Sequence, residues 1–346
     1  MRIGMMLKRA GTFRQTADDL VDYENAGLQL VAVPEAYSFD AVSQLGYLSA
    51  RATRVEIAAG ILQIYTRTPA LTAMTAAGLD HVSGGRFLLG LGASGPQVIE
   101  GFHGVPYDAP LGRTRELIEI CRMVWRREPL QYDGRHYRIP LPPRNAGPPA
   151  RPLRLIDHPL RERIPISVAA LGPRNVALSA ELAEGWQPVF FHPERADEVW
   201  GGALREGMSR REPALGPLDI MVQAIVGIDE AEPEALATAR RELALYLGGM
   251  GTREHNFYND LAVAYGYPEE AREVQDRYLD GDREGAASAV PEALLRAVTL
   301  IGTSAEVSRQ LRAFSRAGVT TLLARPASGD HAGRIAQIAR LRELAG

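Results

Sequence analysis

The stretch RFLLGLGASGPQ, residues 86–97, joins an apolar run to three glycines, Gly90, Gly92 and Gly95, spaced as G-x-G-x-x-G. This spacing is typical of a dinucleotide-binding turn when it ends the first strand of a βαβ unit and opens a helix. Here three strand–helix units come first, and the following residues 98–112, VIEGFHGVPYDAPLG, have the composition of a loop. The glycines therefore predict a ligand-binding loop after a later strand, where backbone can approach a ring or phosphate closely.

Eight apolar or β-branched runs surround and include this stretch. They cover residues 2–7, 28–34, 55–64, 86–92, 164–170, 185–191, 219–228 and 319–326. Most are continuously hydrophobic, which is typical of parallel strands buried on both faces. Helical patterns lie between them, for example at 16–27, 39–52, 68–82, 113–128 and 232–249. The alternation predicts an α/β protein, a (β/α)8 TIM barrel that forms a single domain over residues 1–346.

Two segments interrupt the alternation. Residues 130–153 contain QYDGRHYRI, which predicts a hairpin turning at Asp133-Gly134, followed by the Pro-rich stretch PLPPRNAGPPARP. Residues 250–298 have mainly helical patterns and predict a helical insertion before the last strand.

Composition limits the classes of partner and site. The net charge is −3 and 46% of the residues are hydrophobic, so neither nucleic acid nor a membrane surface is an expected partner, and a small-molecule substrate is. The single cysteine, Cys121, excludes an internal disulfide and a cysteine zinc cluster, and the seven histidines have no metal-ligand spacing. No signal segment or long apolar run is present, so we expect a cytoplasmic location.

Several segments carry a resemblance to a known family. They are VPEAYSFD (33–40), AAGILQIYTRTP (58–69), the long block 75–117, AALGPRN (169–175), NFYND (256–260) and YGY (265–267). In these segments the chain resembles the bacterial luciferase-like flavin and deazaflavin oxidoreductases. It is most similar to the coenzyme F420-dependent branch typified by methylenetetrahydromethanopterin reductase. The resemblance implies a barrel, usually homodimeric, whose cofactor ring lies at the carboxyl ends of the strands.

The resemblance also implies which residues hold the cofactor. A non-proline cis peptide at Gly60–Ile61 is expected to lie against one face of the ring. Gly92, Ala93, Ser94 and Gly95 match the loop that contacts the ring and its side chain. The segment Ala170, Leu171, Gly172, Pro173 and Arg174 matches the part that holds the phosphate. The free N–H groups of a helix that begins at Pro173, with Arg174 beside them, suit a phosphate.

The pair Glu35-Ala36 departs from the family pattern. Some relatives have Asp-His at this ring-contacting position, with the histidine as proton donor. Ala36 has no such proton, so two interpretations stay open for Glu35. It is either a general acid whose pKa is raised by burial, or a structural carboxylate that accepts backbone hydrogen bonds. Tyr65, Arg67, Tyr107, His103 and His192 also fall on loops that we expect to face the site.

The function predicted from these residues is hydride transfer between reduced F420 and a C=N or C=C bond of a small organic substrate. The alternative is an FMN-dependent luciferase-like monooxygenase. A barrel hydrolase of the glycosidase type needs two carboxylates at strand ends, and only Glu35 is suitably placed. A cofactor-binding protein without catalysis is a further alternative, favoured only by Ala36.

Overall fold

Eight parallel strands close into a barrel, as the sequence predicts. The computed structural model describes residues 1–9, 11–142 and 150–346. The barrel strands are β1 (Arg2–Met6), β2 (Leu30–Val33), β3 (Glu56–Ala59), β5 (Phe87–Gly92), β8 (Ile166–Ala169), β9 (Gly185–Gln187), β10 (Asp219–Ile228) and β12 (Val319–Pro326). Each strand pairs with the next, and β12 pairs with β1 in the register Arg2↔Thr321 to Met5↔Ala324. All eight fall on the predicted runs, so the (β/α)8 barrel is confirmed.

Two short strands were not predicted as separate elements. β4 (Leu62–Gln63) follows β3 after Gly60 and Ile61 and pairs with β5. β11 (Leu300–Gly302) pairs with β10 outside the closed barrel. Strands of two or three residues are too short to show a period of two in the sequence.

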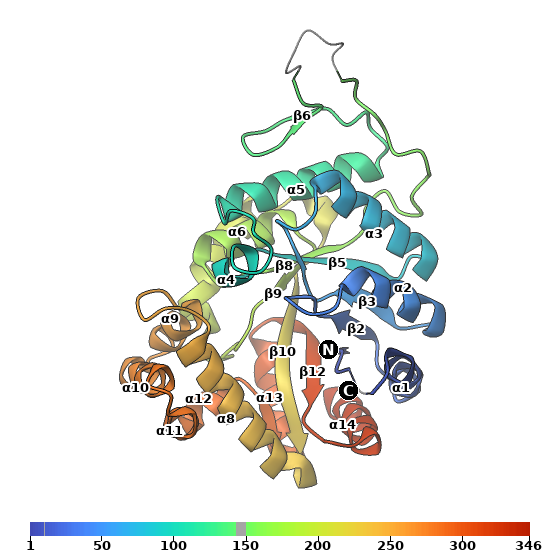
Figure 1. The fold of residues 1–346 in the computed structure, drawn as a ribbon. Coiled ribbons are helices and arrows are strands. Elements are labelled where there is room, and N and C mark those ends of the chain that lie inside the picture. Colours follow the sequence, from blue (N-terminus) through green and yellow to red (C-terminus); the bar gives the residue numbers. More distant parts are fainter. Residues whose placement is uncertain (10, 143–149) are drawn as a thin grey trace.

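Helices cover the outside of the barrel (Figure 1). The longer ones are α1 (Phe13–Asn25), α2 (Ala41–Arg51), α3 (Pro69–Ser83), α5 (Pro110–Trp125), α6 (Pro173–Leu182), α7 (Gly202–Arg210), α8 (Glu232–Gly249), α13 (Ser304–Arg316) and α14 (His331–Ala345). Short helical turns are α4 (Pro96–Ile99), η1 (Asp197–Gly201), η2 (Pro213–Leu215) and η3 (Asp229–Ala231). Thr12, Asp40, Thr68 and Thr303 cap helices with their side chains, which explains where those helices begin. Among the described helices, none is long and apolar enough to cross a membrane.

Residues 257–297 contain four further helices. They are α9 (Phe257–Ala264), α10 (Pro268–Leu279), α11 (Arg283–Ala289) and α12 (Glu292–Ala297). In Figure 1 they lie at one side of the barrel, beside α8. That this segment is an insertion relative to related barrels stays a prediction.

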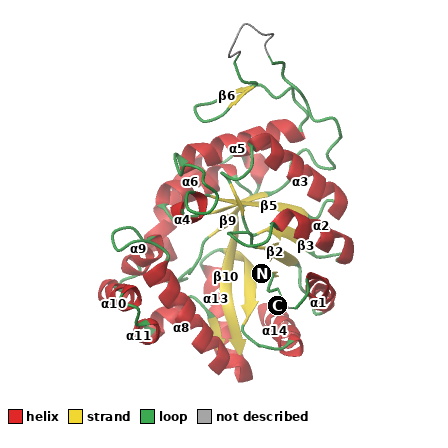
Figure 2. Cartoon of the chain, in the orientation of Figure 1, coloured by secondary structure: helices red, strands yellow, loops and turns green. Residues whose placement is uncertain are grey.

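The hairpin is present, but its turn differs from the predicted one. β6 (Tyr132–Asp133) and β7 (Arg138–Ile139) are antiparallel, and Asp133 pairs with Arg138 within the ladder. The turn is therefore residues 134–137, and the prediction of an Asp133-Gly134 turn was wrong. The reason is Glu116, whose carboxylate accepts the N–H groups of residues 135, 136 and 137 and holds a wider loop open. The hairpin stands outside the ring of helices (Figure 2). Residues 143–149 of the Pro-rich stretch lie outside the described residues.

Two apolar clusters fill the barrel and its surroundings. A small one, Leu30, Ala32, Ala58, Leu88, Met221 and Leu323, is formed by strand positions that alternate with those of the large cluster. It therefore lies inside the barrel, and the large cluster lies between strands and helices. At the amino-terminal end, Arg2 binds Glu56, Asp219 and Thr321 at 2.7, 2.5 and 3.0 Å. This polar cluster occupies the amino-terminal end, so the chemistry is expected at the opposite one.

Replacing Gly90 by alanine tests the packing inside the barrel. An added Cβ would lie 2.0 Å from the carbonyl oxygen of Ala59, a backbone atom of a neighbouring strand that cannot move aside. We expect Gly90→Ala to lower the free energy of unfolding by about 1–3 kcal/mol or more, as measured by urea denaturation. The control is Gly78→Ala on α3, where nothing lies within 4 Å of the new Cβ and a gain of about 0.5–1 kcal/mol is expected. Unchanged stability of Gly90→Ala would contradict this packing.

Candidate active site

The predicted site residues gather at the carboxyl ends of the strands. Gln63 on β4 connects them, since its Nε2 donates to the carbonyl of Ala36 after β2 at 2.6 Å. Gln63 also pairs in register with Gly92, the last residue of β5, and Gly92 pairs with Ala169 of β8. The strand-end segments after β2, β3, β5 and β8 are therefore neighbours at one end of the barrel.

Glu35 is held in a buried ion pair with Arg67. Its Oε1 accepts from Arg67 Nη1 at 2.7 Å and its Oε2 from Arg67 Nη2 at 2.8 Å. Oε2 also accepts the backbone N–H of Ala41, at the start of α2, at 2.9 Å. The hydrogen bonds to Glu35 raise the pKa of Arg67, so its guanidinium stays charged. These contacts match the structural interpretation of Glu35, and its role as an acid stays a prediction.

Two residues of the site loops have left-handed backbone. Ala36 has φ +46° and Ser94 has φ +60°, a conformation that is uncommon outside glycine and is often found at functional sites. Each has its carbonyl bound by a side chain, Ala36 by Gln63 and Ser94 by the Tyr107 hydroxyl at 3.3 Å. Side chains from other elements thus hold both loops in place.

The peptide bond between Gly60 and Ile61 is cis, as the resemblance implies. Ile61 lies beside Gly92, where an added Cβ would be 3.0 Å from the Ile61 side chain. Because glycine has no Cβ, position 92 leaves space for the Ile61 side chain.

Gln63 is a site residue that our sequence analysis missed. Its side chain is 1% exposed, and its Oε1 has no hydrogen-bond partner in the described part of the chain. A buried acceptor without a donor is unfavourable, so Oε1 suits a ligand that carries an N–H or O–H group. The available signal was a polar residue in the otherwise apolar run 55–64.

The start of α6 has the form expected of an anion site. Gly172 is the N-cap and makes no side-chain cap, Pro173 is the first helical residue, and Arg174 is exposed. The two carbonyls that precede Gly172 accept hydrogen bonds from indole N–H groups. Ala170 accepts from Trp186 and Leu171 accepts from Trp200, each at 2.9 Å. No atom lies within 4 Å of a Cβ built on Gly172 or on Gly95. A phosphate therefore has room at this turn. Free backbone N–H groups and the Arg174 guanidinium are available there to bind it.

The other candidate residues have mainly supporting contacts. Tyr65 donates to the Asp108 carbonyl at 2.9 Å, and its ring packs 5.2 Å from that of Tyr107. His103 is exposed, whereas His192 is buried and burial lowers its pKa. The two tyrosines thus brace the loop after β5.

No group of three His, Cys, Asp or Glu side chains in the described ranges is arranged to hold a metal ion.

The chain matches a known family and a named relative along most of its length. The family model described as luciferase-like monooxygenase matches residues 1–321. The chain is 37% identical over 343 residues to a putative coenzyme F420-dependent oxidoreductase, Rv3520c, of Mycobacterium tuberculosis, covering 98% of this chain and 99% of that one.

Solved structures share the fold. The coenzyme F420-dependent tetrahydromethanopterin reductase of Methanopyrus kandleri superposes with a TM-score of 0.81 at 20% identity, covering 98% of this chain and 97% of that one. The oxygenating constituent of 3,6-diketocamphane monooxygenase from Pseudomonas putida, in complex with FMN, has a TM-score of 0.64 at 18% identity, covering 100% and 98%.

Replacing Gln63 by leucine tests whether its Oε1 is unsatisfied. The change removes a buried acceptor, which lowers the free energy of unfolding by about 1–3 kcal/mol when it has no donor. The Ala36 carbonyl loses its hydrogen bond from Gln63, but Ala36 is exposed, so water can replace that donor. We expect Gln63→Leu to keep or raise the Tm of the ligand-free protein. The control is Gln275→Leu, because Gln275 is also buried and donates to a backbone carbonyl, that of Thr252, but its Oε1 is not a buried oxygen without a partner. This variant should lower the Tm. A large loss of Tm in Gln63→Leu would show that a buried water or another group satisfies Oε1.

Proposed function

The chain belongs to the luciferase-like family and is an oxidoreductase, and we propose that it transfers a hydride between reduced coenzyme F420 and a C=N or C=C bond of a small organic molecule. The observation that carries the proposal is the 37% identity, over 98% of the chain, to a protein named as an F420-dependent oxidoreductase. The site is compatible with such a cofactor, because a buried acceptor and an anion-binding turn lie at the same end of the barrel.

The residues fit the parts of a deazaflavin. Gln63 Oε1 would accept from an N–H of the ring, and the backbone of Gly60 and Ile61 with the loop 92–95 would enclose the ring. The turn at Gly172 and the guanidinium of Arg174 would bind the phosphate. When bound, the reduced deazaflavin supplies a hydride to the carbon of the substrate double bond, while the neighbouring nitrogen or carbon takes a proton.

The source of that proton is the open chemical question. Glu35 is the acidic residue nearest to the family's proton-donor position, because it precedes Ala36. Its carboxylate oxygens accept from Arg67 and Ala41, so donation would require a rearrangement of this ion pair. We keep Glu35 as the proposed donor, with water as the alternative.

An FMN-dependent monooxygenase is the second candidate. It is favoured by the family description and by the FMN-bound relative in fold. The first experiment is therefore to add F420 and FMN separately to the ligand-free protein and to measure the Tm. We expect F420 to raise it more, because ligand binding stabilises in proportion to affinity. A shift with FMN alone would replace the proposal by the monooxygenase.

The homodimer and the cytoplasmic location stay predictions. Light scattering on the purified chain measures the first directly, and a monomer at micromolar concentration would contradict it.

Arg174→Ala tests the proposed phosphate contact. Loss of one charge-assisted hydrogen bond is worth roughly 1.5–3 kcal/mol, so the Kd for F420 should rise about ten- to a hundredfold while turnover of the saturated enzyme changes little. Fluorescence titration measures the Kd. Arg309→Ala, at an exposed arginine of α13, is the control and should bind F420 as the wild type does. An unchanged Kd in Arg174→Ala removes this residue from the site.

Glu35→Gln tests the proposed proton donor. Glutamine keeps the acceptor toward Arg67 but has no carboxyl proton, so kcat should fall roughly 10²–10⁴-fold, with F420 affinity kept and one limb of the pH–rate profile lost. The matched control is Arg67→Met, which breaks the same ion pair but keeps the carboxyl group and should keep the limb. If Tm falls by the same amount in both variants and kcat falls only modestly and equally, Glu35 is structural and water is the donor.

A further inference from the structure

The wall of the barrel opposite the proposed ring position is formed by β10. In the closed strand order, three strands separate β3 from β10 in either direction. A ring that rests against Gly60 and Ile61, at the end of β3, would therefore turn its free face toward β10 and its neighbours. Side chains there would face the reacting carbon.

Gln223 and Arg325 are the polar side chains of this wall. Met221 and Leu323 belong to the interior cluster, and the alternation of a strand places Gln223 and Arg325, two residues further on, on the same inner face. They border a small hollow of about 10 Å³, enough for one water molecule, that is lined by Val189, Phe190, Gln223, Ala224, Ile225, Ala239, Glu242, Leu243, Val298, Thr299 and Arg325. None of the proposed cofactor residues lines this hollow. Gln223 and Arg325 are only partly buried, so a substrate would contact the open side of this wall and not the inside of the hollow.

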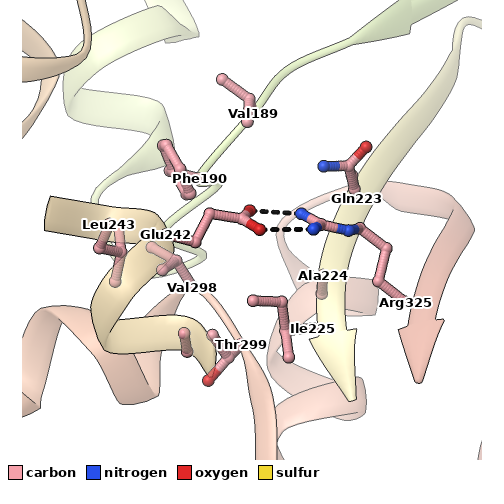
Figure 3. A pocket seen from close by; sticks show the side chains of 11 residues that line it. Val189, Phe190, Gln223, Ala224, Ile225, Glu242, Leu243, Val298, Thr299 and Arg325 are labelled. Carbon is pink, nitrogen blue, oxygen red and sulfur yellow. Dashed lines mark hydrogen bonds and ion pairs between the residues drawn. The ribbon is translucent and has the colours of Figure 1, made fainter. Parts of the chain in front are cut away.

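The charge of Arg325 is balanced by a residue of α8. Both carboxylate oxygens of Glu242 accept from the two terminal nitrogens of Arg325. Figure 3 shows Arg325 reaching past β10 to Glu242, with Gln223 on one side of the pair and Ile225 on the other. An anionic group would therefore meet an ion pair without net charge.

Aromatic side chains continue the wall toward the mouth. The Phe190 ring, after β9, meets the edges of Tyr246 at 5.1 Å and Tyr258 at 6.2 Å, and the two tyrosines are 4.7 Å apart. Burial raises the pKa of Tyr246, and that of Tyr258 to about 12, so both hydroxyls are neutral donors near pH 7.

We propose that Gln223, Phe190, Tyr246 and the Arg325–Glu242 pair form the substrate-binding wall and select an uncharged, flat, conjugated molecule that carries a carbonyl or imine acceptor. Aromatic rings bind such a flat body by stacking or edge contacts. The Gln223 amide and the tyrosine hydroxyl supply hydrogen bonds, and the balanced ion pair disfavours a carboxylate or phosphate. This inference rests on the proposed function for the position of the ring.

Cinnamamide and cinnamate are matched probes, because they share a conjugated aromatic body and differ in charge. Their Kd values are measured by ligand-observed NMR on the full chain, with and without oxidised F420. The wild type should bind cinnamamide at least about tenfold more tightly. In Glu242→Gln the freed Arg325 should change the ratio of the two Kd values at least about tenfold toward cinnamate, the size of one charge-assisted hydrogen bond. Glu232→Gln, which breaks the α8 ion pair with Arg296, should leave the ratio unchanged.

Two further variants test the proposal independently if Glu242→Gln does not fold. The double variant Glu242→Gln/Arg325→Gln carries no charge at the pair and should keep the wild-type preference. Gln223→Leu should weaken cinnamamide severalfold and cinnamate less. Any one of three results would overturn the proposal. They are a preference of the wild type for cinnamate, an unchanged ratio of the two Kd values in folded Glu242→Gln, and unchanged Kd values in Gln223→Leu.

The outcomes separate this proposal from the proposed function. If F420 neither binds nor is oxidised but the probe ratios change as expected, the proposed function fails and the wall stands. If F420 binds and reacts but the ratios do not change, the wall fails and the function stands.

Discussion

The strands of the barrel do not pair over equal lengths around its circumference. This difference separates the side proposed for the cofactor from the side proposed for the substrate. β1 and β12 join the two ends of the chain through four paired residues, whereas β9 and β10 are paired only at Asp219↔Gly185 and Ile220↔Trp186. β9 ends at Gln187 while β10 continues to Ile228. Beyond this short seam the wall is completed by side chains, and Glu242 of α8 reaches Arg325 there. From β2 to β8, β5 pairs first with β3 and then, beyond the Gly60–Ile61 bond, with β4, and backbone and small residues form the wall.

The side from β2 to β8 is where we propose that the planar cofactor ring binds. Glycine at positions 90 and 92 lets strands and Ile61 approach closely, and Gln63 ties the end of β2 to the end of β4. The other side has long polar and aromatic side chains from α8, β10 and β12.

Arg67–Glu35 and Arg325–Glu242 are arginine–carboxylate pairs joined by two hydrogen bonds each. Partly buried ion pairs of this kind fix geometry more than they add stability. Arg67 and Glu35 connect the loop after β4 to the start of α2. The charge that remains exposed for a ligand in the proposed site is that of Arg174 on α6.

The sequence by itself determined the eight barrel strands, because continuous apolar runs are local features, and the family resemblance implied the cis bond at Gly60–Ile61. The ligand-binding role of the loop Gly92–Gly95 stays a prediction. It could not find the turn at 134–137, since Glu116, which binds that turn, lies in a helix earlier in the chain. It also could not find the unsatisfied oxygen of Gln63 or the pairing of Arg325 with Glu242, 83 residues apart. Those were decided only by the tertiary structure, because barrel closure and side-chain burial bring together groups whose spacing in the chain carries no signal.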